Sequence, residues 1–323
     1  MRYRKLGRTD VSVSEISLGC WTLGGLNWVN GQPNGWADVD EKEAAQAVDH
    51  ALDCGVNHFD NADVYGNGRA ERMLARILGD RTKKILIATK VGHFPGTAEH
   101  AFEPTHIRHQ CEQSLINLHR DHIDLYYLHH GDFGKDARYL EGAARTMQDL
   151  KKEGKIRLIG QSAYSNDDFE RAVPVVQPDV LQSWAHSADT GFIQPGSRVR
   201  RLMDERGMSY VAFSPLAQGL LLGKYKSGAP PQFEEGDHRK RSSQFTVENI
   251  ARMEPKIERL KERFGGDVKD LARAALQYLL SFPCVACVIP GFRNQRQVEV
   301  NLSCADNPLT PQDAEFIRDV FEP

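Results

Sequence analysis

The sequence predicts an α/β protein, a single TIM barrel in which eight parallel strands alternate with helices, the (β/α)8 fold. Three observations lead to this prediction. Short β-rich runs alternate with longer helical patterns from residue 16 onward, eight such units follow one another, and no change of composition separates them. Crossovers long enough to hold a helix make neighbouring strands parallel. An unbroken series of eight units favours a closed barrel over an open sheet, and we expect one domain over residues 1–323.

The predicted strands are short runs rich in apolar and β-branched residues. They are expected at residues 16–19, 56–59, 84–89, 122–128, 156–159, 180–183, 209–213 and 284–289. Such runs, bounded by glycine or polar residues, are typical of buried strands.

The predicted helices carry apolar residues at intervals of three and four. They are expected at residues 41–54, 68–78, 104–118, 139–152, 169–173, 199–206, 267–281, 295–302 and 311–321. Gly55 stops the first of these helices, Pro104 suits the first turn of the third, and Ser165 offers an N-terminal cap before the fifth.

The segment of residues 219–249 interrupts this alternation. It contains Gly228-Ala229-Pro230-Pro231 and a charged run at residues 234–241. A loop of this length in a compact domain is usually functional or disordered. Because it follows a strand, we expect it among long loops on the active face of the barrel.

The composition is that of an ordinary globular protein. The net charge is −3, from 41 basic and 44 acidic residues. This balance argues against nucleic acid as the main partner, which would favour a strongly basic surface. No apolar segment of the secretory type follows the N-terminus, and no stretch approaches the ~18 apolar residues of a membrane span. We therefore expect a cytoplasmic protein with no membrane partner, while its oligomeric state stays open.

The six cysteines are expected to be free thiols. Cys284 and Cys287 have the spacing of a metal or redox pair, but no second such pair lies nearby and the segment begins a predicted strand. We therefore interpret them as core residues and predict no metal site.

Four polar side chains stand at the ends of three successive predicted strands. Asp60 ends the second strand, Tyr65 lies five residues further, Lys90 ends the third and His129 ends the fourth. Active sites of such barrels lie at the C-terminal strand ends, so we expect the four to converge there. A lone tyrosine or strand-end charge is more often a packing or rim residue. The functional interpretation therefore rests on the occurrence of all four residue types together at these strand ends.

These residue types suit the reduction of a carbonyl group. Hydride addition leaves negative charge on the oxygen, so a proton donor is needed there. Tyr65 can donate, and we expect Lys90 beside it to favour the phenolate and lower its pKa. Asp60 would pair with Lys90 and fix its position. His129 would hydrogen-bond the carbonyl oxygen and orient the substrate.

One glycine-rich segment imitates a dinucleotide-binding fingerprint. Residues 66–71 follow a strand and open a helix, but Glu71 stands where the third glycine should be. We interpret the segment as a turn that starts a helix, which makes a doubly wound nucleotide-binding fold improbable.

The chain resembles the aldo-keto reductase superfamily over nearly its whole length. The resemblance rests on Phe59-Asp60-Asn61-Ala62-Asp63-Val64-Tyr65-Gly66 and on residues 88–90, 123–129, 154–160, 213–216, 219–221 and 288–291, which occur in the family's order. Residues 3–9 and 18–21 match the family's N-terminal β-hairpin and first strand. The branch that it resembles most contains bacterial inositol-operon-type reductases and relatives of potassium-channel β subunits.

The resemblance implies NADPH-dependent reduction of a small carbonyl substrate. It implies Tyr65 as the general acid, with Asp60, Lys90 and His129 completing a catalytic tetrad. It also implies cofactor contacts at Cys20, Trp21, Asp60, Ser162, Gln182, Phe213, Ser214, Pro215, Leu216, Gln218, Gly219, Leu220, Gly291, Phe292, Arg293, Gln297 and Asn301.

These contacts divide along the cofactor. Ser162 and Gln182 would bind the nicotinamide carboxamide, and Phe213 would lie under the ring. The backbone of residues 214–220 would wrap the pyrophosphate, and residues 291–301 would hold the adenosine end. Arg293 can clamp a 2′-phosphate with two parallel hydrogen bonds, which favours NADPH over NADH.

The sequence departs from the family pattern at three places. Ala163 replaces an asparagine common beside Ser162, His130-Gly131-Asp132 replaces an Arg-Pro-Asp type sequence, and Val300 replaces an acidic residue. Two other functions stay open: a nucleotide-sensing module with slow turnover, and a sugar-alcohol dehydrogenase that runs the reverse reaction. Substrate choice would depend on the loops at residues 28–36, 93–102, 130–138 and 223–249, where tryptophans could line a pocket.

Overall fold

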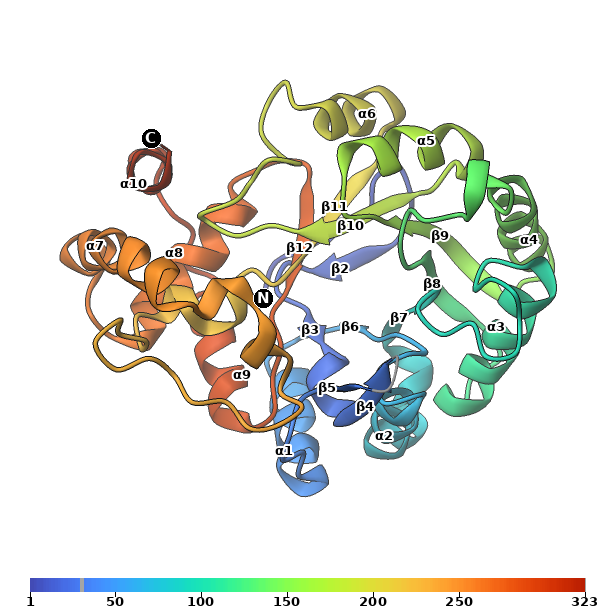
Figure 1. Ribbon diagram of the computed structural model, residues 1–323, viewed down its shortest axis with the longest axis horizontal. Coiled ribbons are helices and arrows are strands. Elements are labelled where there is room, and N and C mark those ends of the chain that lie inside the picture. The colour runs from blue at the N-terminus through green and yellow to red at the C-terminus, as the bar shows by residue number, and fades with distance from the viewer. Residues whose placement is uncertain (30–31, 323) are drawn as a thin grey trace.

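A computed structural model describes residues 1–29 and 32–322 as a ring of strands surrounded by helices (Figure 1). The eight strands are β3 (Leu18–Gly19), β6 (His58–Asp60), β7 (Leu86–Val91), β8 (Ile123–Leu128), β9 (Ile156–Ser162), β10 (Val180–Trp184), β11 (Ser209–Phe213) and β12 (Val285–Ile289). Neighbouring strands in this order pair in parallel. Parallel bridges Ile16–Val288 and Gly19–Gly291 join the first strand to the last. The predicted barrel is thereby confirmed.

Helices follow the strands and pack around the outside of the ring (Figure 1). They are α1 (Glu41–Asp53), α2 (Arg69–Leu78), α3 (Pro104–Leu118), α4 (Leu140–Lys152), α5 (Asn166–Val176), α6 (Arg198–Arg206), α7 (Val247–Phe264), α8 (Val268–Leu280), α9 (Gln295–Leu302) and α10 (Pro311–Phe321). Side chains cap several of them, as where Ser165 accepts a hydrogen bond from the Asp168 backbone at the start of α5. In the described part of the chain, none of these helices combines the length and apolar character of a membrane span.

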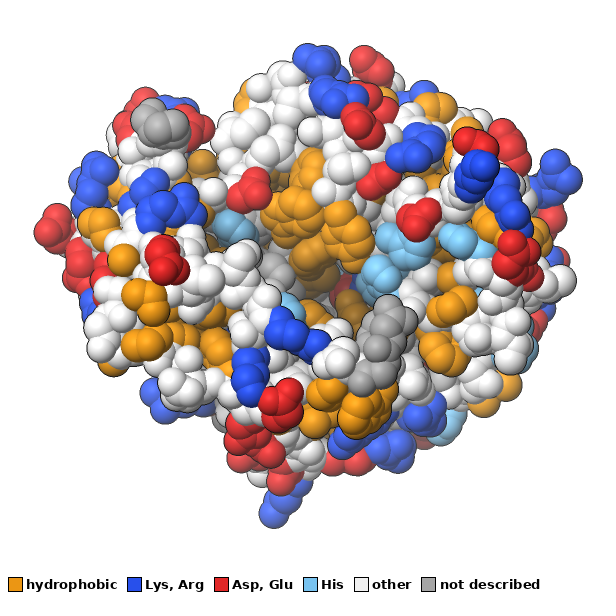
Figure 2. All heavy atoms as spheres, in the orientation of Figure 1, with side chains coloured by type: hydrophobic (Ala, Val, Ile, Leu, Met, Phe, Trp, Pro, Cys, Tyr) orange, Lys and Arg blue, Asp and Glu red, His pale blue; other side chains and the backbone are white. Residues whose placement is uncertain are grey.

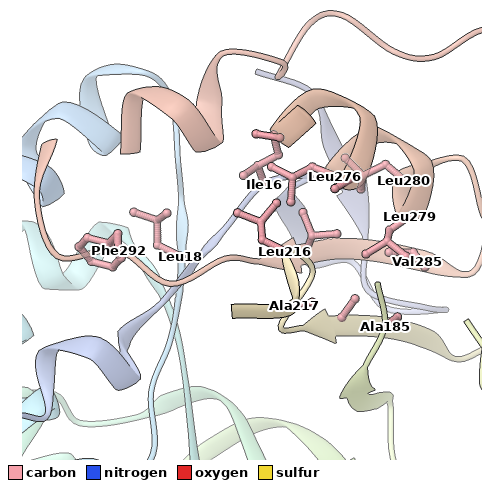
Figure 3. Close-up of a cluster of buried hydrophobic side chains, with 14 of the residues drawn as sticks. Ile16, Leu18, Ala185, Leu216, Ala217, Leu276, Leu279, Leu280, Val285 and Phe292 are labelled. Carbon is pink, nitrogen blue, oxygen red and sulfur yellow. The ribbon is translucent and has the colours of Figure 1, made fainter. Parts of the chain in front are cut away.

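The seam of the barrel, where the first strand β3 meets the last strand β12, is covered by packed apolar side chains. Leu276 and Leu280 of α8, Val285 of β12 and Ile16 are fully or almost fully buried. Figure 3 shows these side chains gathered beside the segment that follows β11. Burying a side chain of this size contributes about 1.5–3 kcal/mol. The helix thus holds the two ends of the sheet together.

An N-terminal β-hairpin, β1 (Tyr3–Lys5) with β2 (Ser12–Ser14), lies against the start of β12. Arg4 donates hydrogen bonds to the Val285 and Leu280 carbonyls at 2.9 and 2.8 Å and pairs with the buried carboxylate of Glu15 at 2.5 Å. The hairpin therefore attaches to the end of the barrel opposite the C-terminal strand ends.

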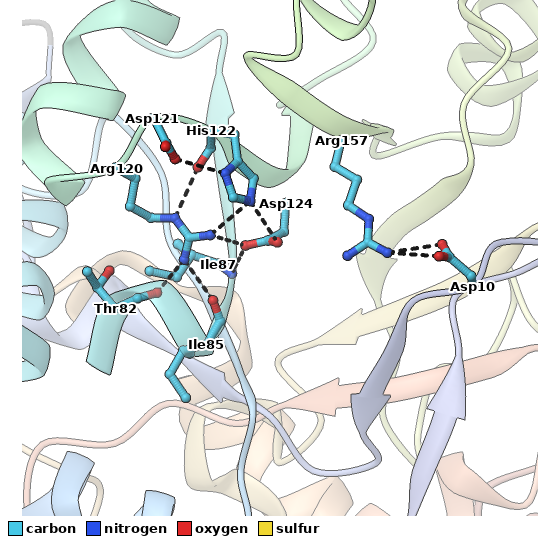
Figure 4. Close-up of polar contacts among 9 residues, drawn as sticks. All are labelled: Asp10, Thr82, Ile85, Ile87, Arg120, Asp121, His122, Asp124 and Arg157. Carbon is cyan, nitrogen blue, oxygen red and sulfur yellow. Dashed lines mark hydrogen bonds and ion pairs between the residues drawn. The ribbon is translucent and has the colours of Figure 1, made fainter. Parts of the chain in front are cut away.

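A buried polar network aligns β7 with β8 (Figure 4). Arg120 donates to the carbonyls of Thr82 and Ile85 at 2.6 and 2.7 Å and pairs with Asp124 at 2.9 Å. Asp124 in turn accepts the backbone N–H of Ile87 at 2.9 Å. Because β7 carries Lys90 and β8 leads to His129, this network fixes the relative height of two predicted site residues.

Two elements near the barrel mouth differ from the prediction. Strand β4 (Leu26–Val29) pairs with β5 (Gln32–Gly35) in an antiparallel manner, while residues 30–31 of the expected substrate loop lie outside the described residues. The predicted loop at residues 219–249 contains short 3-10 helices and leads into α7. Arg241 from this segment donates to the Pro33 carbonyl of β5. Its His238 packs on Trp21, with ring centroids 4.6 Å apart.

Candidate active site

The four side chains predicted to act together occupy one side of the barrel mouth. Asp60 ends β6, Lys90 is the fifth residue of β7, and His129 directly follows β8. Tyr65 lies in the turn between β6 and α2, where its N–H bonds to the Ala62 carbonyl at 3.1 Å. Parallel pairing of β6, β7 and β8 brings these positions to one edge.

The Lys90 ammonium group is the centre of this arrangement. Lys90 and Asp60 are 1% and 2% exposed, and Nζ donates to one oxygen of the Asp60 carboxylate. It also donates to the Asn61 carbonyl at 2.6 Å and to Tyr65 Oη at 3.4 Å. Since an ammonium has three N–H groups, these partners use its full donor capacity. The other Asp60 oxygen accepts Gln182 Nε2 at 2.8 Å.

The expected net lowering of the Tyr65 pKa is wrong for this structure. Burial raises the pKa of the Tyr65 phenol well above its ordinary value, and the negative charge of Asp60 raises it further. Lys90 still favours the phenolate, but it lies closer to Asp60 than to Tyr65, so its charge offsets only part of this rise. Tyr65 is therefore protonated near neutral pH, as a proton donor must be.

His129 is a neutral imidazole in this setting. Burial lowers its pKa well below the ordinary value, and the neighbouring His93 and Lys90 lower it further. Its ring centroid lies 6.0 Å from that of Tyr65 and 4.4 Å from that of His93. A neutral imidazole can donate one hydrogen bond, which suits contact with a carbonyl oxygen.

The residues expected at the nicotinamide end lie on β9, β10 and β11. Ser162 ends β9, and its buried hydroxyl has no hydrogen-bond partner among the residues that the structure describes. Such an orphaned polar atom fits a ligand amide. Gln182 on β10 already donates to Asp60, a link that the sequence did not indicate. Phe213 ends β11 with its ring partly exposed.

The segment after β11 has the backbone of an anion-binding loop. Ser214, Ala217, Gln218 and Gly219 all have positive φ, at 53°, 45°, 55° and 94°. Turns of this kind form concave nests that suit phosphate. In the same segment Pro215, Leu216 and Leu220 are buried.

Two basic residues near this loop, Lys224 and Arg239, were not predicted as cofactor contacts from the sequence. A Cβ on Gly219 would lie 3.1 Å from Lys224 Nζ. Burial lowers the pKa of Lys224, and the nearby positive charges of Arg239 and Arg293 lower it further. Clustered cations next to a phosphate-type loop fit a polyphosphate ligand. The sequence signal that could have identified them is the group of basic residues in the segment of residues 219–249.

The residues expected at the adenosine end form a loop that bonds to itself and to the short 3-10 helix Cys20–Leu23, which follows β3. Gln297 Oε1 accepts the Arg293 N–H at 2.8 Å, and Asn301 Nδ2 donates to the Gly291 carbonyl at 3.2 Å. The buried Phe292 accepts a hydrogen bond at its carbonyl from Thr22. Gln297 and Asn301 therefore shape the loop in this structure.

The remaining predicted contacts lie beside that loop. The Arg293 guanidinium carbon lies 5.9 Å from the Trp36 ring centroid. Cys20 is buried directly after β3, and the Trp21 ring stacks on Tyr65 with centroids 6.0 Å apart. The predicted cofactor contacts thus run from the tetrad, across the barrel mouth, to the loop before α9.

The mouth itself is hollowed, with hydrophobic and histidine side chains around the hollow (Figure 2). His93, from the loop expected to affect substrate choice, lies beside His129, and Tyr164, which was assigned no role from the sequence, lies beside Trp184. His130, a departure from the family pattern, bonds through Nε2 to the Gly92 carbonyl at 2.8 Å. Its ring centroid lies 4.8 Å from that of His93.

The sequence profile of the aldo/keto reductase family matches residues 15–322. A probable voltage-gated potassium channel subunit β of Arabidopsis thaliana is 29% identical over 342 residues, covering 100% of this chain and 97% of that protein. The aldo-keto reductase yakc [NADP(+)] of Schizosaccharomyces pombe is 29% identical, covering 99% and 91%.

A solved structure agrees with these similarities. The glycerol dehydrogenase AKR11B4 from Gluconobacter oxydans superposes with a TM-score of 0.80 at 25% identity, covering 98% of this chain and 94% of that one. The resemblance inferred from the motifs is therefore confirmed, and the chain belongs to the aldo/keto reductase family of oxidoreductases, which use nicotinamide cofactors.

Proposed function

We propose that this protein reduces an aldehyde or ketone to the alcohol with NADPH, using Tyr65 as the general acid. One observation carries the proposal. Lys90 Nζ is held between the buried Asp60 carboxylate and Tyr65 Oη, at the C-terminal ends of barrel strands. A buried cation beside a protonated phenol is an arrangement that can stabilise the anion left after proton donation.

A bound nicotinamide cofactor supplies the hydride that adds to the carbonyl carbon. As negative charge develops on the oxygen, Tyr65 donates its hydroxyl proton to it. Lys90 stabilises the resulting phenolate, while Asp60 and Gln182 keep the ammonium group in place. Neutral His129 donates a hydrogen bond to the same oxygen. Tyr65 then regains a proton from solvent, and the product is the alcohol.

Two observations favour NADPH as the cofactor. Arg293 lies in the loop expected to hold the adenosine end, and one relative carries NADP(+) in its name. A guanidinium can bind a 2′-phosphate in a bidentate manner that NADH cannot use.

Arg293→Ala is expected to raise the KM for NADPH by roughly 10- to 100-fold, the value of hydrogen bonds to a charged group, while changing the KM for NADH much less. Steady-state kinetics with both cofactors measures this. The matched control is Arg296→Ala, an exposed arginine three residues away, which should keep the wild-type preference. An unchanged preference in Arg293→Ala would remove the 2′-phosphate role.

The function is tested by following NADPH oxidation with a panel of aldehydes, ketones and keto-sugars, alongside direct measurement of NADPH binding. Binding with turnover supports the reductase. Tight binding with no turnover across the panel would instead support a nucleotide-sensing module, a second function favoured by the similarity to a channel β subunit. Oxidation of polyols with NADP+ tests the reverse direction, which the similarity to a glycerol dehydrogenase makes relevant.

A further inference from the structure

Two side chains that the proposed chemistry does not use meet across the mouth of the barrel. His93 follows β7 by two residues, and Tyr164 follows β9 by two residues. His93 Nε2 and Tyr164 Oη lie 3.1 Å apart, a hydrogen bond between residues 71 positions apart in the sequence. Because β8 lies between β7 and β9 in the sheet, the pair spans the end of the strand that leads to His129.

The pair faces the space where a substrate must enter. Both side chains are exposed, Tyr164 to 41%, in a region where most neighbouring rings are buried or half-buried. The His93 ring centroid is 4.4 Å from that of His129, which the proposed function places on the carbonyl oxygen. A group that contacts this pair is therefore only a few bonds from the reacting carbon.

The pair is electrically neutral. Neighbouring rings shield part of the His93 side chain from water, and this partial burial lowers its pKa to about 4, with His130 and Lys90 contributing. Partial burial likewise raises the pKa of Tyr164 to about 12, with Tyr65 contributing. Near neutral pH the two groups offer one ring nitrogen and one hydroxyl as donors and acceptors, and neither carries a charge that would attract a carboxylate.

Aromatic surfaces border this polar point. The Tyr164 ring is nearly parallel to that of Trp184, with centroids 6.1 Å apart and planes 9° apart. Phe213 stands edge-on to it at 6.4 Å. A ligand beside Tyr164 thus meets apolar ring surface except where it reaches the two polar atoms. Polar atoms bordered by apolar rings favour partners that can hydrogen-bond to them.

We propose that the His93–Tyr164 pair is a specificity-determining site that binds a hydroxyl group on the carbon next to the reacting carbonyl. The inference rests on the proposed reductase function and narrows its substrates to neutral α-hydroxy aldehydes and ketones. In the reaction the carbonyl carbon gains hydride from NADPH and the oxygen gains the Tyr65 proton. The neighbouring hydroxyl is unchanged, so the product is a vicinal diol.

The test compares hydroxyacetone with butanone, which differ by a hydroxyl in place of a methyl group. For wild type we expect kcat/KM for hydroxyacetone to exceed that for butanone by about tenfold, the value of one good hydrogen bond. Tyr164→Phe removes only the hydroxyl, and His93→Phe removes both ring nitrogens. Each should lower this ratio by about three- to tenfold. Pyruvate, which is anionic, should be the poorest of the three substrates.

Each variant is judged by the ratio of its kcat/KM values for hydroxyacetone and butanone. A general change of activity affects both values alike, so the ratio reports recognition of the hydroxyl group. If the two side chains bind the same hydroxyl, the double variant should lower the ratio little more than either single variant. His109→Phe is the matched control, because His109 is an exposed histidine of α3 outside the loops expected to set substrate choice, and its ratio should equal that of wild type.

Two outcomes would overturn the inference in distinguishable ways. Reduction of both ketones with a ratio near one, or a ratio unaffected by both variants, would remove the specificity role while leaving the reductase function intact. Binding of NADPH without reduction of any carbonyl would remove the proposed function, and this inference with it.

Discussion

Replacing Tyr65 by phenylalanine is expected to lower kcat for carbonyl reduction by roughly 10²- to 10⁴-fold, the usual contribution of a positioned general acid. The substitution removes a single oxygen atom and keeps the ring that stacks on Trp21. The raised pKa of the Tyr65 phenol means that the wild-type residue is a proton donor across the neutral range. Phenylalanine has no proton to give.

The measurement pairs steady-state turnover with NADPH binding. Binding should stay close to that of wild type, which separates a chemical defect from a cofactor defect. Tyr126→Phe provides the matched control. Tyr126 is a buried tyrosine of β8 whose hydroxyl finds no partner within residues 1–29 and 32–322, so its loss should leave turnover near the wild-type value. Full activity in Tyr65→Phe would show that another group is the acid.

Lys90→Met is expected to damage both stability and activity. It leaves the Asp60 carboxylate buried with Gln182 as its remaining side-chain partner. Removing one member of a buried ion pair costs about 3–5 kcal/mol in the free energy of unfolding, because the other charge is left uncompensated. Loss of the cation beside Tyr65 should also lower kcat/KM by about 10²- to 10³-fold, as for other groups that stabilise developing charge.

A double variant separates these two effects. Lys90→Met combined with Asp60→Asn removes the uncompensated charge, so denaturant unfolding should show recovery of most of the lost stability. Activity should not recover, because the cation is still missing. If the single variant were as stable as wild type, the ion pair would not hold this part of the barrel together.

The strands that carry the candidate site could be predicted because their sequence pattern is simple. The runs before Lys90 and His129 are mainly apolar apart from Thr89 and Asp124, a pattern typical of strands buried on both faces. The ends of parallel strands necessarily share an edge. The meeting of Asp60, Lys90 and His129 therefore followed from strand order alone.

Two of the elements that escaped prediction contain prolines. Helix α7 carries Pro255 in its interior, and β5 contains Pro33, although proline is unfavourable in both settings. In α7 the regular burial of Ile250, Met253, Ile257 and Leu260 outweighs the lost hydrogen bond. That apolar spacing was the signal that could have identified the helix.

The electrostatic error at Tyr65 has a different origin. The sequence places a lysine near a tyrosine and an aspartate, but the pKa of Tyr65 depends first on burial of the phenol and then on the nearest charges. Burial and the distances between atoms are set by side-chain packing, as is the His93–Tyr164 contact across 71 positions. Strand order brings residues to one edge, whereas side-chain packing decides how they pair.

The seam of the barrel has a consequence for how the protein is made. Strand β3 pairs with the region of β12 through bridges such as Ile16–Val288, so the ring closes only when nearly the whole chain is available. Contacts so distant in sequence slow folding, because the entropy of a long loop is lost before the contact forms. Until β12 is synthesised, any sheet formed by the first seven strands would have unpaired edges at β3 and at β11. The loop expected to hold the adenosine end follows β12, so the nascent chain gains its cofactor site last, and a premature stop before β12 would leave two exposed edges open to aggregation.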